Sequence, residues 1–170
     1  MKITSSTFIS SIKFDYFKTY SFNRINPHDS SEENISGISE ANKYDVYVLD
    51  KNYELSSSAR LISTINASSN DSQELLRILN INIQEELRFL CAPIYRDAIL
   101  FFNASHELVG GLNICFECDR IVDLNNIYIS TDFMAFKYLK LFLLKLGHNI
   151  EQPTYFHADD VLAFAKKNKK

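Results

Sequence analysis

Two cysteines three positions apart are the residues of this 170-residue chain whose spacing comes closest to a chemical motif. Cys115 and Cys118 stand at the end of the apolar run in LNICFECDRI. Such a pair forms half of a zinc site when a tight turn brings both sulfurs to one side. It forms a redox pair when it opens a helix whose dipole lowers the thiol pKa. When neither condition holds, the thiols act as small apolar core residues.

A zinc site needs more ligands than this pair supplies. Cys91 is the third cysteine of the sequence, and the four histidines stand singly, at no ligand spacing. Residues three apart in a continuing strand point to opposite faces, so Cys115 and Cys118 share a metal only if the strand stops at Cys115. We therefore expect thiols that pack in the core, with a zinc site on Cys91, Cys115 and Cys118 as the alternative.

A redox role for the same three cysteines has less support. Asp119 follows the pair and raises a neighbouring thiol pKa, and no helical pattern begins before residue 131. A disulfide from Cys91 to Cys115 or Cys118 needs an oxidising setting. The N-terminal residues lack the apolar core of a signal peptide, so we expect a cytoplasmic protein with reduced thiols.

The stretch around the cysteines contains Cys91, Pro93, Arg96, the apolar run AILFF, a hairpin turn and the run LNICFEC. This arrangement resembles a core of small uncharacterised bacterial proteins, in which a C-x-P-x-x-R-x-apolar strand is followed by a strand that ends in I-C-F-x-C. The resemblance covers residues 87–120. It implies a fold element and a common neighbourhood for the three cysteines, and it implies no reaction.

The composition is that of an ordinary globular protein, with 46% hydrophobic and 23% charged residues. The net charge of −3 includes four lysines between Lys166 and Lys170, so the remainder of the chain carries −7 (−3 − 4). An acidic body argues against nucleic-acid binding, which relies on clustered Lys and Arg. No window approaches the ~20 apolar residues of a membrane span, so we expect no membrane insertion.

Hydrophobic periodicity and turn residues predict an α+β fold. The expected strands cover residues 12–22, 44–49, 59–65, 98–102, 108–116 and 127–129. The expected helices cover residues 72–79, 83–90, 133–146 and 157–167. Because strands and helices do not alternate regularly, we predict a single antiparallel sheet with a central hairpin at about 97–117 and helices packed on one face. A single domain is expected to span residues 1–170, with a flexible acidic loop at 23–42.

A few residues mark the ends of these elements. Asp71, with a glutamate three positions later, is typical of a capping box at the start of the first helix. Asp132 offers a cap to the longest helix, and Gly147 suits the left-handed position after its last turn. Gly110 and Gly111 interrupt the second strand of the hairpin and indicate a bulge or a close backbone approach.

The sequence contains no nucleophile elbow, phosphate-binding loop or metalloprotease motif, which argues against an enzyme. Residues 27–54 carry seven acids and two lysines, an excess of negative charge that suits a basic partner. We therefore predict a non-enzymatic protein–protein interaction module, of the kind in which an antidote or immunity protein blocks a basic toxin. The alternative is a structural metal or thiol-redox protein that uses zinc or the three thiols. The expected contact residues are Glu32, Glu33, Glu40, Tyr44, Tyr47 and Arg96.

Overall fold

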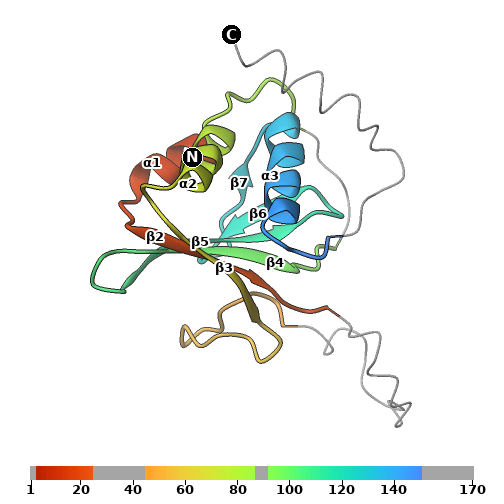
Figure 1. The fold of residues 1–170 in the computed structure, drawn as a ribbon. Coiled ribbons are helices and arrows are strands. Elements are labelled where there is room, and N and C mark those ends of the chain that lie inside the picture. The colour runs from red at the N-terminus through yellow and green to blue at the C-terminus, as the bar shows by residue number, and fades with distance from the viewer. Residues whose placement is uncertain (1–2, 25–44, 87–91, 151–170) are drawn as a thin grey trace.

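In the computed structural model of the chain, which describes residues 3–24, 45–86 and 92–150, the centre is a five-stranded antiparallel sheet (Figure 1). Its strand order is β3-β2-β4-β5-β6. The strands are β2 (Tyr16–Ser21), β3 (Arg60–Asn66), β4 (Asp97–Phe102), β5 (Leu108–Cys115) and β6 (Arg120–Asp123). The prediction of an α+β fold with a main antiparallel sheet is confirmed, and β4 and β5 form the predicted central hairpin.

The helices of the described residues cover one face of this sheet, as predicted (Figure 1). Phe17, Phe101 and Ile114 of the sheet are buried there in one core with Leu75 and Leu139 of the helices. These helices are shorter or more polar than a membrane crossing requires. Their bounds are α1 (Ser5–Ser11), α2 (Asn70–Leu79) and α3 (Phe133–Lys145).

The prediction of a single sheet omits helix α1 and a small second sheet. This second sheet is a parallel pair of β1 (Ile3–Thr4) and β7 (Ile129–Ser130). The α1 sequence is rich in serine, which favours caps and turns over helix interiors. Its helix is fixed by tertiary contacts, because Phe8 and Ile9 are buried against the core and Thr4 accepts a hydrogen bond from the Thr7 backbone N–H.

The other face of the sheet is covered by residues 45–59. Val48 is fully buried there, and its backbone N–H donates to Asn113 Oδ1 on β5 at 2.8 Å. The predicted strand at 44–49 is wrong in its described part, which forms bends and a single isolated bridge. Because the Val48 backbone N–H bonds a side chain on the sheet face, it is not available to a neighbouring strand. The segment therefore packs on the sheet without forming a ladder of strand hydrogen bonds.

Helix α2 begins two residues earlier than predicted. Its N-cap is Ser69, whose hydroxyl accepts a hydrogen bond from the Ser72 backbone N–H. The predicted capping box at Asp71 is therefore wrong, because Asp71 lies in the first turn and faces outward. Its carboxylate bonds the Nζ atom of Lys145 at 2.7 Å and so ties α2 to α3.

The predicted helix at 83–90 is wrong in its described part, residues 83–86, which form no helix. The backbone N–H groups of Gln84 and Glu85 donate instead to Asp132 Oδ2, at 2.8 and 3.1 Å. The remainder of that predicted helix lies outside the described residues. The predicted terminal helix lies outside them as well, as does the predicted acidic loop apart from its first two residues.

Asp132 also caps α3, as predicted. Its Oδ1 atom accepts from the backbone N–H groups of Met134 and Ala135, at 2.8 and 3.4 Å. Burial raises the pKa of this carboxyl group, but the four backbone donors together outweigh burial and hold the pKa below its ordinary value. One charged side chain therefore joins α3 to the segment that leads away from α2.

The predicted roles of the glycines are confirmed. A Cβ atom on Gly111 would lie 2.7 Å from Leu100 Cδ2 and 2.8 Å from Leu124 Cδ2, so these side chains pack closely on the glycine and would have to shift to admit a larger residue. The β4–β5 register also shifts between Phe101 and Phe102, which marks a bulge beside the glycines. Gly147 has a φ of +102° and ends α3.

Replacing Asp132 with alanine is expected to lower the free energy of unfolding at pH 7 by about 1–3 kcal/mol, because four backbone N–H groups lose their charged acceptor. The folded-state pKa is lowered, so this stabilisation is present above the ordinary value of 3.8 and is lost as the pH falls through the folded-state pKa. Denaturant unfolding from neutral to acid pH measures both effects. Ser69→Ala removes an uncharged cap and serves as the control with no such pH dependence. An Asp132→Ala protein with the wild-type acid profile would contradict this assignment.

Candidate functional site

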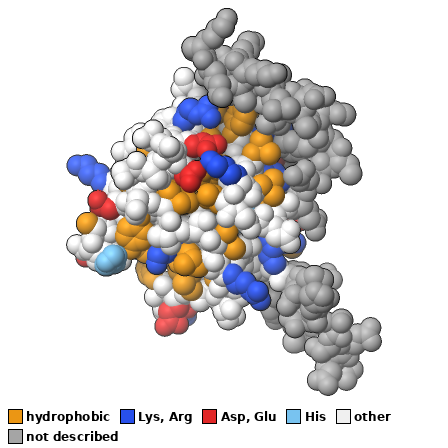
Figure 2. Space-filling view, viewed as in Figure 1, with side chains coloured by type: hydrophobic (Ala, Val, Ile, Leu, Met, Phe, Trp, Pro, Cys, Tyr) orange, Lys and Arg blue, Asp and Glu red, His pale blue; other side chains and the backbone are white. Residues whose placement is uncertain are grey.

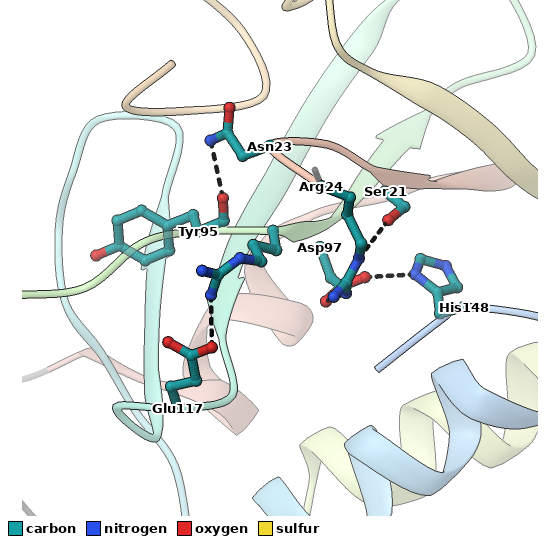
Figure 3. Close-up of polar contacts among 8 residues, drawn as sticks. Ser21, Asn23, Arg24, Tyr95, Asp97, Glu117 and His148 are labelled. Carbon is teal, nitrogen blue, oxygen red and sulfur yellow. Dashed lines mark hydrogen bonds and ion pairs between the residues drawn. The ribbon is translucent and has the colours of Figure 1, made fainter. Parts of the chain in front are cut away.

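Polar side chains gather at one end of the sheet, where β2 ends and β4 begins (Figure 3). Most of them are buried or half-buried, and they come from segments far apart in the sequence. The residues are Ser21, Asn23, Arg24, Tyr95, Arg96, Asp97, Glu117 and His148.

Asp97 is the centre of the group on the helix side of the sheet. It is 1% exposed, and its two oxygens are both bonded. Arg24 Nη2 donates to Oδ2 at 2.6 Å, and His148 Nδ1 lies 2.7 Å from Oδ1 (Figure 3). A carboxylate withdrawn from water in this way is stable only when it is paired and hydrogen-bonded. The contacts therefore tie the segment after β2 and the chain after α3 to the first residue of β4.

The combination of Ser21, Asp97 and His148 has the residue types of a hydrolytic triad but lacks its connections. A triad requires the serine hydroxyl to bond the second histidine nitrogen. Here Ser21 Oγ accepts from Arg24 Nε at 2.9 Å. His148 Nε2 is buried and has no hydrogen-bond partner among the described residues. This group therefore holds the sheet end together and does not activate a nucleophile.

Asn23 fixes the segment on the opposite side. Its backbone is left-handed, with a φ of 54°, a conformation that asparagine tolerates better than most residues. Its side chain donates to the carbonyl oxygens of Asp45 (2.6 Å) and Tyr95 (3.1 Å) and accepts from the Asp45 backbone N–H (3.0 Å). Its own backbone N–H donates to Ser58 Oγ at 3.0 Å. Both ends of the 45–58 segment are thus attached to the end of β2.

Arg96 is one of the predicted contact residues and lies in this group. Its Nη1 atom bonds Glu117 Oε1 at 2.7 Å, with Glu117 on the turn between β5 and β6 (Figure 3). The two side chains are 23% and 61% exposed. An ion pair this exposed to water adds little stability and stays accessible to a partner.

Tyr47, a second predicted contact residue, packs on Tyr95 with 5.6 Å between ring centroids. Burial raises the pKa of Tyr95 to about 12, and the nearby Arg120 guanidinium opposes that rise. Burial likewise raises the pKa of Tyr47. Both hydroxyl groups are therefore protonated at neutral pH and are available as hydrogen-bond donors.

Strand β5 stops at Cys115, and a turn of residues 116–119 leads back into β6. Asp119 in this turn has a φ of 44°. Cys115 and Cys118 are consequently both buried in the core on the second face. This meets the condition under which the two sulfurs lie on the same side of the sheet.

The two sulfurs are not equivalent. Cys118 is disulfide-bonded, whereas Cys115 is a free thiol that is 1% exposed. Burial raises the pKa of Cys115, while the backbone N–H groups of Cys118, Ile94 and Glu117 act in the opposite direction. In residues 3–24, 45–86 and 92–150, no three His, Cys, Asp or Glu side chains form a group that could hold a metal ion.

The remaining predicted site residues, Cys91, Glu32, Glu33, Glu40 and Tyr44, lie outside the described residues. The Asp97 group was not predicted from the sequence. Its members are separated by 73 and 51 positions from Asp97, so no local spacing connects them. The one available signal is an acidic residue at the start of the apolar run DAILFF.

Comparison of the chain with protein-family models, with curated proteins and with solved structures finds no match.

Proposed function

We propose that this protein is a non-enzymatic binding protein that recognises a protein partner through residues 45–61. Four large hydrophobic residues in this stretch are exposed, and we call them the contact surface. They are Val46 (66% exposed), Tyr53 (65%), Leu55 (48%) and Leu61 (53%). In the described part of the chain, the other large hydrophobic residue with comparable exposure is Ile127 (44%). This concentration of exposed apolar side chains is the observation that carries the proposal.

On the face shown in Figure 2, hydrophobic side chains form patches among Lys, Arg, Asp and Glu side chains. Apolar side chains exposed in this way are covered at low entropic cost when their backbone is already ordered. Leu61 lies on β3, which is an edge of the described sheet.

The backbone that carries the contact surface has fixed hydrogen bonds. Asp50 accepts from the backbone N–H groups of Asn52 and Glu54, at 2.7 and 2.9 Å, and thereby closes the turn in the middle of the segment. An isolated bridge joins Leu49 to Leu55 on either side of that turn. These bonds support a preformed surface that changes little when a partner binds.

A basic partner, such as a toxin that the protein neutralises, is the specific version of the proposal. This version is based on the acidic residues between positions 27 and 54, which would attract a positively charged partner. Two of these acids have internal roles, since Asp45 Oδ2 accepts from Ser56 Oγ at 2.5 Å and Asp50 closes the turn. Attraction of a basic partner therefore falls mainly to the other acids, including Glu32, Glu33 and Glu40.

Replacing Val46, Tyr53 and Leu55 together with serine is expected to weaken partner binding by well over tenfold, because buried apolar anchors contribute about 1 kcal/mol or more each. The wild-type protein, immobilised and exposed to an extract of its source cells, provides the partner for affinity measurements. Ile127→Ser is the matched control, as it removes an exposed apolar side chain outside the contact surface. The proposal fails if the triple variant and Ile127→Ser retain the same proteins with equal affinity.

The same measurement at several salt concentrations tests the basic partner. Changing Glu32, Glu33 and Glu40 together to glutamine should slow association and flatten its salt dependence. Unchanged kinetics would remove the basic partner from the proposal and leave the contact surface in place.

A second candidate function is the structural metal or thiol-redox site on Cys91, Cys115 and Cys118, of which the redox version is compatible with a disulfide at Cys118, whereas a metal site needs that disulfide to be reduced. It is favoured by the turn that places Cys115 and Cys118 in one core and by the backbone N–H groups that face the Cys115 sulfur. These donors oppose burial without outweighing it, so the pKa of Cys115 stays raised and formation of the reactive thiolate requires exposure of the thiol.

Elemental analysis together with thiol counting separates the two functions. For a binding protein we expect no stoichiometric metal and a Cys115 thiol that reacts with a thiol reagent only after unfolding, because it is buried with a raised pKa. Cys115→Ser provides the blank for that reaction. Bound zinc or a fast-reacting thiol in the native protein would favour the second function. A disulfide at Cys118 suits an oxidising compartment, so the number of free thiols also tests the expected cytoplasmic location.

A further inference from the structure

Arg120, the first residue of β6, lies among tyrosines at the same end of the sheet. Its Cζ atom is 5.8 Å from the centre of the Tyr128 ring, which is a cation–π distance. The guanidinium also faces the hydroxyl group of Tyr95, on which the Tyr47 ring packs. Figure 3 shows Tyr95 at the end of the sheet where Glu117 lies.

The positive charge of Arg120 has no acidic partner within the described ranges. Two other half-buried arginines at this sheet end are each paired, Arg24 with Asp97 and Arg96 with Glu117. Arg120 is half-buried as well, and its Nε atom is buried without a hydrogen-bond partner. The guanidinium has lost part of its hydration, and its side-chain hydrogen bond to Tyr95 supplies a neutral oxygen that does not balance its charge, so it favours the binding of an anion.

We infer that Arg120 binds a carboxylate group of the protein partner, an inference that rests on the proposed function. The planar guanidinium fork matches a carboxylate through two parallel hydrogen bonds. A single uncompensated charge suits a monoanion, whereas a phosphate dianion requires a second cation, and Arg96 is already neutralised by Glu117.

The neighbouring residues place this carboxylate at the edge of the contact surface. Tyr47, whose ring packs on Tyr95, directly follows Val46, the most exposed residue of the contact surface. The protonated hydroxyl group of Tyr95 is a further donor to the same anion. A partner would thus insert an acidic side chain or its C-terminal carboxylate at Arg120 and cover the apolar residues beside it.

Titration of the isolated full chain with sodium acetate tests the site without a partner. The readout is the NMR signal of the Arg120 Nε–H group together with the backbone amides of Arg120 and Tyr128. We expect saturable shifts with a roughly millimolar dissociation constant, beyond those caused by sodium chloride at equal ionic strength. Arg120→Lys keeps the charge but loses the fork, and it should weaken the response of the backbone amides about tenfold. Arg77→Gln is the matched control, because it removes an arginine of α2 outside this sheet end, and it should bind acetate as the wild type does.

The inference is overturned if chloride reproduces the acetate shifts, if Arg120→Lys binds acetate equally well, or if Arg77→Gln abolishes binding. Tighter binding of inorganic phosphate than of acetate would overturn the choice of a carboxylate. Because no partner is present, acetate binding is measured independently of the contact surface. A protein that binds acetate but retains no partner would contradict the proposed function and leave Arg120 only as a carboxylate site, while a protein that retains a partner without binding acetate would contradict this inference alone.

Discussion

A buried carboxylate at the first position of β4 is the constraint on which the end of the sheet depends. Asp97 is 1% exposed, and Arg24 and His148 bond its two oxygens at 2.6 and 2.7 Å. Removing a charge from water costs several kcal/mol unless an opposite charge and hydrogen bonds within the protein compensate for the lost hydration. The chain after β2 and the chain after α3 are therefore both held at Asp97, beside the core on the helix side.

The opposite side of the same sheet end is built with neutral hydrogen bonds. Asn23, next to Arg24, holds the 45–58 segment through its side chain and its backbone N–H. Asn113 holds the middle of that segment through Val48. The adjacent residues Asn23 and Arg24 thus hold segments on opposite faces of the sheet. Arg24 does so through its charge, and Asn23 does so through hydrogen bonds of its amide groups. The exposed apolar residues of 45–61 are consequently carried by an ordered backbone, which is the physical basis for proposing recognition of a partner.

Local patterns predict the parts of this fold that local contacts determine. The β4–β5 hairpin, the cap of α3 at Asp132 and the left-handed Gly147 follow from periodicity, capping and backbone conformation, and all are present. Residues 45–49 and 83–86 depart from prediction because distant side chains, Asn113 and Asp132, take up their backbone N–H groups. The polar site escaped prediction for a related reason. Arg96 could be singled out because it is close to the cysteines in the sequence. The role of Asp97 depends on contacts with residues 51 and 73 positions away, which no local pattern indicates.

The free energy of unfolding of Asp97→Asn at pH 7 tests most directly whether the sheet end is organised around a buried charge. Asparagine keeps the shape of the side chain but removes the charge that Arg24 and His148 face. The structural role predicts a loss of about 3 kcal/mol or more, relieved in part when His148→Gln is added, because the two side chains interact directly. Wild-type stability in Asp97→Asn, or strictly additive effects of the two substitutions, would contradict it.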